Sequence, residues 1–149
     1  MELRSDAFEN NGLIPSQYTC DGDNVNPSLE ILQIPEGTKS LSLIMDDPDS
    51  MKATGKIWDH WVVFNMSPDT VKIEEGNEPQ GILGVNSFGN RGYGGACPSD
   101  GEHSYIFRVY ALDTELDLVD GATKEQVEEF MKDHIIETAE LIGRYERQQ

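Results

Sequence analysis

Two carboxylates and a histidine follow one another across a short loop that joins two apolar runs. Asp47 and Asp49 flank a proline in an acidic turn, and Trp58 and His60 open the next apolar run. A proline in such a turn ends a strand, because it donates no hydrogen bond to a neighbouring strand. If the flanking strands pair with each other, these side chains lie together at one end of a sheet. A carboxylate there can fix the tautomer of a histidine and favour its charged form.

A second junction supplies a similar set of residues. Gly101, His103 and Tyr105 stand at alternate positions where a loop enters another apolar run, and Gly95 lies in the glycine-rich loop ahead of them. Either junction alone is commonly only a turn or a cap. Two junctions that each supply a histidine, with carboxylates and a tyrosine nearby, predict a small-molecule pocket at the end of the sheet.

Cys97 allows an enzymatic alternative, a hydrolase that uses this cysteine or an aspartate–histidine pair. A cysteine in a glycine- and proline-containing loop is more often structural, so we expect a protein that is not an enzyme. His60, His103 and Asp47 could in principle bind zinc, but no H-E-x-x-H motif or other histidine pair four residues apart is present. We therefore predict no metal and no cofactor.

Short apolar runs in the first part of the chain predict the strands that must position these residues. The predicted strands are residues 28–35, 40–45, 60–66 and 105–112. Leu41, Leu43 and Met45 alternate along one face of their run, whereas residues 60–66 are continuously apolar in the middle. A continuously apolar strand is typical of the centre of a sheet that is covered on both faces.

The pattern becomes helical near the C-terminus. Thr123 and Gln126 have the spacing of a capping box, and apolar residues follow at helical spacing over 127–142, with Gly143 as a stop. Asp133 and the histidine after it either lie within one helix or separate two shorter ones. Many strands followed by terminal helices, without βαβ alternation, predict a mostly β fold: a β-sandwich with C-terminal helices, in one domain over 1–149.

Charge restricts the class of partner. The 149 residues include 28 acidic and 11 basic side chains, a formal net charge of −17. Nucleic acid and anionic membrane surfaces both require basic patches, so we exclude them as partners. The start of the chain has no apolar core of a signal peptide, and no window reaches the length of a membrane span, so we expect a cytoplasmic protein. In a reducing cytosol Cys20 and Cys97 are expected to be unpaired, with a Cys20–Cys97 bridge as the less favoured alternative.

The segments taken together carry a family resemblance. The motifs are Asp47-Pro-Asp-Ser-Met51, Trp58-Asp-His-Trp61, Gly95-Ala-Cys-Pro-Ser99 and Gly101-Glu-His-Ser-Tyr105, with flanking matches at residues 18–22, 26–29, 110–113 and 134–145. Over nearly its whole length the chain resembles the phosphatidylethanolamine-binding protein family, in its compact bacterial and archaeal Raf-kinase-inhibitor-like branch. Met51, Ser99 and Ser104 depart from the usual Pro, Pro and Arg of the motifs, which changes the rim of the pocket.

The resemblance implies a β-sandwich built on a central antiparallel sheet, with a terminal helix over residues 134–145 and a small anion pocket at one end. Members bind phosphate or phosphoryl headgroups there, and some modulate kinases or inhibit serine proteases. We therefore expect a non-catalytic binding or regulatory protein with a small phosphoryl-type anion or phospholipid headgroup as ligand and a kinase or protease as partner. A pure protein-interaction inhibitor with an unused pocket stays open, as does a homodimer.

The residues expected to bind the ligand are Asp47, Asp49, Trp58, His60, Gly95, Gly101, His103 and Tyr105. We expect the two histidines, the tyrosine hydroxyl and the backbone amides of Gly94 and Gly95 to donate hydrogen bonds to the anion, and Trp58 to form an apolar wall. The two carboxylates either accept from the far ring nitrogen of a histidine or receive the ammonium of an ethanolamine-like headgroup or the proton of a protonated phosphate.

Overall fold

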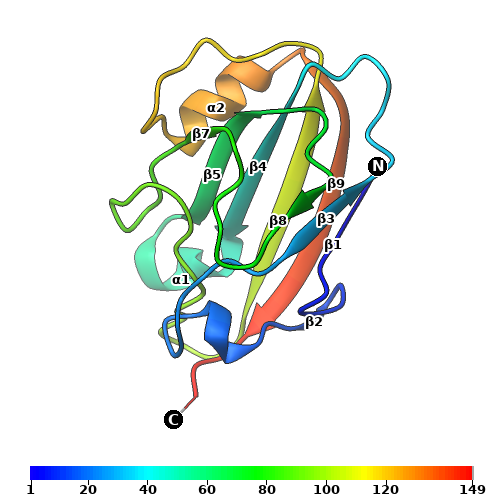
Figure 1. Ribbon diagram of the computed structural model, residues 1–149. Helices are drawn as coiled ribbons and strands as arrows, with labels where there is room; N and C mark the ends of the chain where they lie inside the picture. Colours follow the sequence, from blue (N-terminus) through cyan, green and yellow to red (C-terminus); the bar gives the residue numbers. More distant parts are fainter. Residues whose placement is uncertain (149) are drawn as a thin grey trace.

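Two β-sheets face each other across the main core (Figure 1). The computed structural model describes residues 1–148. The small sheet has the order β1 (Glu2–Arg4), β3 (Leu29–Leu32), β6 (Lys72–Ile73). The large sheet has the order β2 (Gly12–Leu13), β9 (Ile135–Tyr145), β8 (His103–Leu112), β4 (Ser40–Asp47), β5 (Trp58–Met66), β7 (Ile82–Leu83). Its strands pair antiparallel except for β2, which runs parallel to β9.

All four predicted strands form, as β3, β4, β5 and β8. The alternation in β4 places Leu41, Leu43 and Met45 in the core between the sheets, whereas Ile44 faces the opposite side. On that side Ile44 packs with Val62 of β5 and with the helix α2 (Lys124–Met131). The chain therefore forms three layers, and the mostly β prediction is confirmed. Burial on both faces explains the continuously apolar middle of β5.

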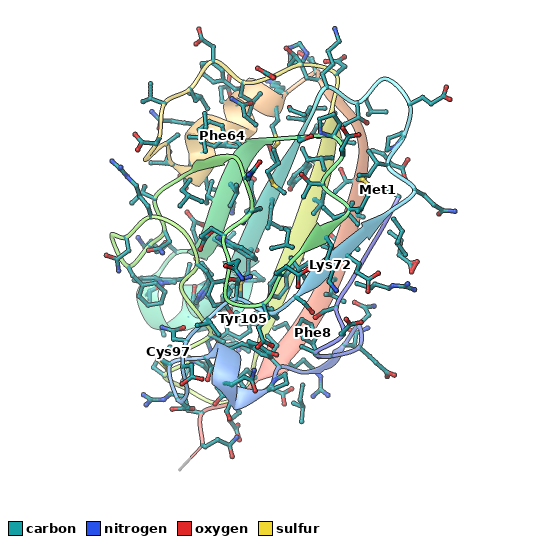
Figure 2. The ribbon with its side chains drawn as sticks, viewed as in Figure 1. Met1, Phe8, Phe64, Lys72, Cys97 and Tyr105 are labelled. Atoms are coloured by element: carbon teal, nitrogen blue, oxygen red, sulfur yellow. A yellow bond between two sulfur atoms is a disulfide. The ribbon has the colours of Figure 1, made fainter. Side chains whose placement is uncertain are left out.

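The remaining helical elements are short: η1 (Ser16–Tyr18), η2 (Pro48–Ser50) and α1 (Met51–Thr54). The predicted capping box is present, because Gln126 N donates to Thr123 Oγ1 and Thr123 N donates to Gln126 Oε1. Phe64, in the core next to α2, lies far from Tyr105 and Cys97, which lie at the opposite end of the molecule (Figure 2).

The helix expected over residues 134–142, and the terminal helix implied over 134–145, are wrong. This segment is strand β9, which pairs with β8 from His103↔Tyr145 to Leu112↔Ile135. The same residues also satisfy a period of two, with Ala139, Leu141 and Tyr145 buried on one face. Ladder hydrogen bonds and burial in the inter-sheet core outweigh the helical spacing, since local propensity is a weak determinant when the two compete. Within residues 1–148, α2 is the one helix of the C-terminal part.

The expectation of unpaired cysteines is also wrong. Cys20 and Cys97 form a disulfide, with their Cα atoms 5.4 Å apart. The bridge joins the loop after η1 to the loop before β8, where Cys20 N also donates to Ala96 O. Among residues 1–148, no helix is long and apolar enough to cross a membrane.

Candidate functional site

The two predicted junctions meet at one end of the large sheet around a cavity of about 230 Å³. Antiparallel pairing of β4 with β5 and with β8 brings the end of β4 next to the starts of the other two strands. Five of the predicted residues line the cavity: Asp47, Trp58, His60, His103 and Tyr105. The structure thus brings residues of both junctions into one site.

A bulge in β5 aims His60 into this site. Met45 pairs with Trp61 and Asp46 pairs with Asp59, so His60 has no partner of its own on β4. An extra residue in one strand lets neighbouring side chains point to the same side, a common device beside binding sites. His60 consequently lies against Tyr105, with ring centroids 5.2 Å apart at an angle of 82°.

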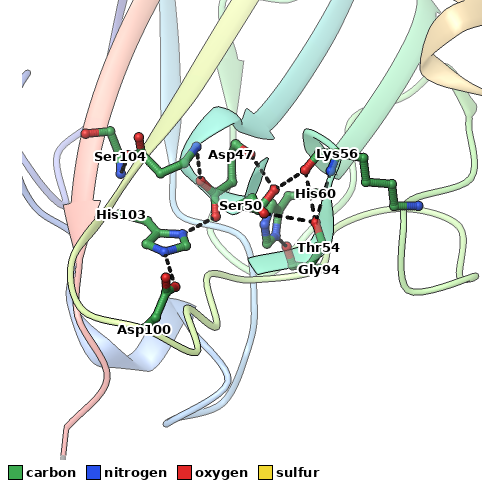
Figure 3. A network of polar contacts seen from close by, with 10 residues as sticks. Asp47, Ser50, Thr54, Lys56, His60, Gly94, Asp100, His103 and Ser104 are labelled. Atoms are coloured by element: carbon green, nitrogen blue, oxygen red, sulfur yellow. Dashed lines mark hydrogen bonds and ion pairs between the residues drawn. The ribbon is translucent and has the colours of Figure 1, made fainter. Parts of the chain in front are cut away.

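His103 is held between two carboxylates (Figure 3). Its Nδ1 lies 2.6 Å from Asp47 Oδ2 and its Nε2 lies 2.7 Å from Asp100 Oδ1. Ionised carboxylates only accept, so both ring nitrogens carry a proton and the ring is an imidazolium. Burial lowers the pKa of His103, but the hydrogen bonds to Asp47 and Asp100 outweigh it and raise the pKa above the ordinary value. Asp47 thus accepts from a histidine, one of the two arrangements expected for the carboxylates, whereas the second acceptor is Asp100 and not Asp49.

His60 is held differently and stays neutral. Its Nδ1 donates to the backbone oxygen of Gly94 at 2.8 Å, which leaves Nε2 without a proton in the neutral ring. Burial lowers the pKa of His60, and the bond to Gly94 only partly offsets this. The free nitrogen of His60 is therefore an acceptor rather than the donor expected from the sequence.

Two buried donors at the cavity have no hydrogen-bond partner among the described residues, Trp58 Nε1 and Tyr105 Oη. Burial, followed by the negative charge of Asp47, raises the pKa of Tyr105, so its hydroxyl keeps the proton. An indole N–H can only donate. These two groups are the buried donors of the site without such a partner, although Asp47 and the backbone of Cys97 lie close to the Tyr105 hydroxyl. The exposed hydroxyl of Ser99 is a further donor at the cavity.

The other expected donors are engaged within the chain. Gly94 N donates to His60 O, and Gly95 N donates to Asn24 Oδ1 at 2.8 Å. Gly95 does not line the cavity; a Cβ there would collide with Asn24 Oδ1 and Tyr18 O, so the glycine permits close packing of two loops.

Asp49 and Gly101 also lie beside the cavity without lining it. Asp49 Oδ2 accepts from the backbone N–H of Ser104 at 2.8 Å and so ties the turn after β4 to the start of β8. Gly101 has φ = 78°, a left-handed conformation that favours glycine. Both residues shape the site rather than face it.

Several lining residues were not predicted from the sequence. They are Ser50, Ala53, Thr54, Phe88 and Pro98. The ring of Phe88 packs edge-on against both Trp58 and His60, with centroids 5.6 and 5.5 Å away. Phe88 stands in a polar loop, where a lone aromatic is the only available signal. Of the departures from the family motif, Ser99 lines the cavity, whereas Met51 lies outside it and is half exposed.

Cys97 lines the cavity, but its sulfur is bonded to Cys20. A disulfide sulfur offers no thiolate, so the hydrolase that would use Cys97 as nucleophile is excluded for this oxidised form. Among residues 1–148, no group of three or more His, Cys, Asp or Glu side chains is arranged to hold a metal ion.

A larger and more open hollow, of about 610 Å³, lies on the other side of β5. Its buried lysine is paired within the chain: Lys124 Nζ lies 2.8 Å from Asp46 Oδ2 and 3.7 Å from Asp59 Oδ1. Burial raises the pKa of Asp59 to about 6, although Lys124 opposes the shift. This hollow contains none of the cavity's unpartnered donors.

Comparisons with known proteins cover nearly the whole chain. The family model described as "Phosphatidylethanolamine-binding protein" matches residues 4–146. A UPF0098 protein of Methanothermobacter thermautotrophicus is 50% identical over 153 residues, covering 99% of each chain. A crystal structure of a putative phosphatidylethanolamine-binding protein homologue of Chlamydia trachomatis has a TM-score of 0.94 and 42% identity, covering 99% of this chain and 97% of that one. Escherichia coli YbcL, described as a member of the mammalian family, has a TM-score of 0.89 and 32% identity, covering 99% and 98%. The chain belongs to the phosphatidylethanolamine-binding protein family.

Proposed function

We propose that this protein is a non-catalytic binding protein whose cavity takes a small phosphoryl-type anion, either free phosphate or the phosphoryl group of a headgroup. The observation that carries the proposal is the pair of unpartnered donors, Trp58 Nε1 and Tyr105 Oη, at the same cavity. A buried polar group without a partner costs about 1–3 kcal/mol. A ligand oxygen between the two donors would remove that cost.

The polar groups match a protonated phosphoryl group in kind. Trp58 and Tyr105 donate to its oxygens, whereas His60 Nε2 is an acceptor and can receive its P–OH proton. The imidazolium of His103 also lines the cavity, with its charge paired to Asp47 and Asp100. Donors and an acceptor in one small cavity favour a monoprotonated phosphate or phosphate monoester over a carboxylate, which lacks the hydroxyl.

The size and wall of the cavity limit the rest of the ligand. A volume of about 230 Å³ is below the roughly 300–1,000 Å³ of drug-sized ligand pockets. Phe88, Ala53 and Pro98 form an apolar side on which a short carbon chain can lie. The cavity suits a headgroup rather than a whole lipid. With a net charge of −17 the chain repels anions at long range, so binding relies on contacts inside the cavity.

Calorimetric titration with inorganic phosphate and with phosphoethanolamine tests the proposal on wild type, Tyr105→Phe and Tyr110→Phe. Tyr105 and Tyr110 are on the same strand but on opposite faces of the sheet, so the second variant is a matched control. Loss of one charge-assisted hydrogen bond should weaken binding about tenfold or more in Tyr105→Phe, and Tyr110→Phe should bind as wild type does.

Equal affinities for wild type and Tyr105→Phe would contradict the proposed role of the hydroxyl. Absence of binding by all three proteins would favour the alternative without a ligand, an inhibitor that acts only through protein contacts. Comparison of the two titrants separates free phosphate from a headgroup, because only phosphoethanolamine carries an ammonium that Asp47 or Asp49 can receive. A kinase or serine protease as the downstream partner is proposed from the family resemblance.

A further inference from the structure

The two carboxylates that hold His103 differ in how firmly they are fixed. The side chain of Asp47 is 4% exposed and that of Asp100 is 49% exposed. Asp47 ends a central strand, whereas Asp100 lies in the loop that carries the cavity residues Pro98 and Ser99. Asp100 can therefore turn toward solvent at small cost, but moving Asp47 would leave a buried charge unpaired.

The carboxylate of Asp100, which does not itself line the cavity, holds the one N–H of His103 that Asp47 does not bind. It accepts the Nε2–H of His103 at 2.7 Å, and His103 lines the cavity. Carboxylate and phosphoryl oxygens are acceptors of the same kind for an imidazolium. A ligand oxygen gains this N–H only by displacing Asp100, and while Asp100 stays it repels the ligand's negative charge.

We propose that Asp100 is a specificity-determining residue of the cavity: its carboxylate is a built-in competitor that weakens the binding of phosphoryl anions, dianions more than monoanions. The inference rests on the proposed function and adds a determinant that the family motif does not contain, since position 100 lies between its two parts.

A neighbouring acid provides the control for charge alone. Glu102 is two residues away, and its Oε1 lies 2.9 Å from Arg144 Nη1 rather than near His103. Glu102→Gln therefore removes one negative charge from the same loop without freeing His103. Asp100→Glu keeps the carboxylate, and Asp100→Asn keeps an acceptor of similar size but removes the charge.

The affinity of inorganic phosphate is measured by calorimetry for wild type and these three variants. Asp100→Asn should bind phosphate about tenfold more tightly, because one charged competitor is lost. Asp100→Glu and Glu102→Gln should bind as wild type does. If wild type and Asp100→Asn both bind phosphate with equal affinity, the inference that Asp100 competes with the ligand is overturned, but the proposed function stands. An equal gain in Glu102→Gln also overturns it, and absence of phosphate binding in every protein overturns both proposals.

The pKa of the His103 imidazole, followed by NMR, separates competition from a merely structural effect. Asp100→Asn should lower this pKa, and phosphate should raise it again by replacing the lost carboxylate. The other titratable groups that contact the ring, Asp47 at Nδ1 and Tyr105 stacked beside it with centroids 6.4 Å apart, are unchanged in the variant. A pKa that Asp100→Asn leaves unmoved overturns the inference.

Discussion

His103 Nδ1 lies 2.6 Å from Asp47 Oδ2, and this contact joins the start of β8 to the end of β4 at the floor of the cavity. Both side chains are almost fully buried, and they are 56 residues apart in the chain. A buried ion pair of this kind stabilises the fold only when both groups are charged, because one buried charge without its partner destabilises the folded state. The state of His103 therefore links the stability of the fold to the charge of the site.

We expect the stabilisation from His103 to decline as the pH rises. The pKa of His103 is raised in the folded protein, above the unfolded value of about 6.5. Its contribution is therefore fully present below about pH 6.5 and is lost as the pH rises through the folded-state pKa. In urea unfolding, the free energy of unfolding of wild type should exceed that of His103→Gln most at low pH. The difference should fall as the pH becomes alkaline.

His134→Gln is the control for this measurement. Its imidazole is 45% exposed and pairs with Asp113 at the surface. This variant should lose little stability at any pH. A wild-type advantage over His103→Gln that grows with pH would contradict an imidazolium between two carboxylates.

Removal of the disulfide should destabilise the protein strongly. The bridge links residues with a sequence separation of 77, and closing so long a loop in the unfolded chain gives about 4–5 kcal/mol of stability. We expect that loss in the Cys20→Ser, Cys97→Ser double variant, measured by urea unfolding. The reduced wild type should match the double variant. A loss below about 1 kcal/mol, well under the usual range for a native bridge, would show that Cys20 and Cys97 are not paired in solution.

Ionisation of Asp59 should lower the free energy of unfolding. Burial raises its folded pKa to about 6, above the unfolded value of about 3.9. The folded state then binds more protons between these values, so stability falls as the pH rises from about 4 to 6. Asp59→Asn should gain about 1 kcal/mol over wild type at pH 7.5 and nothing at pH 3.5, in urea unfolding at both pH values. Asp46, the closer partner of Lys124, keeps the lysine paired. A variant less stable than wild type at pH 7.5 would contradict this.

The sequence predicts the strands around the site better than the details of its chemistry. The loop–strand junctions of β4, β5 and β8 are visible because turn residues interrupt apolar runs, and five predicted residues reach one cavity. The apolar residues of strand β9 fit both a helical and a strand period, and only pairing with β8 selects the strand. Asp100 and Phe88 were missed because their roles depend on loop paths. Which ring nitrogen is free also depends on backbone contacts, as with His60 and Gly94.

The indole N–H signals of the two tryptophans test the central claim most directly. Trp58 lines the cavity and its Nε1 has no partner among the described residues, whereas Trp61 Nε1 donates to Glu78 Oε1 at 2.8 Å. In a ¹H–¹⁵N NMR titration with inorganic phosphate, the Trp58 indole signal should shift downfield and saturate, and the Trp61 signal should stay in place. A Trp58 signal that does not move at phosphate concentrations up to the solubility limit would contradict a phosphoryl site in this cavity. So would a Trp58 signal that moves together with that of Trp61.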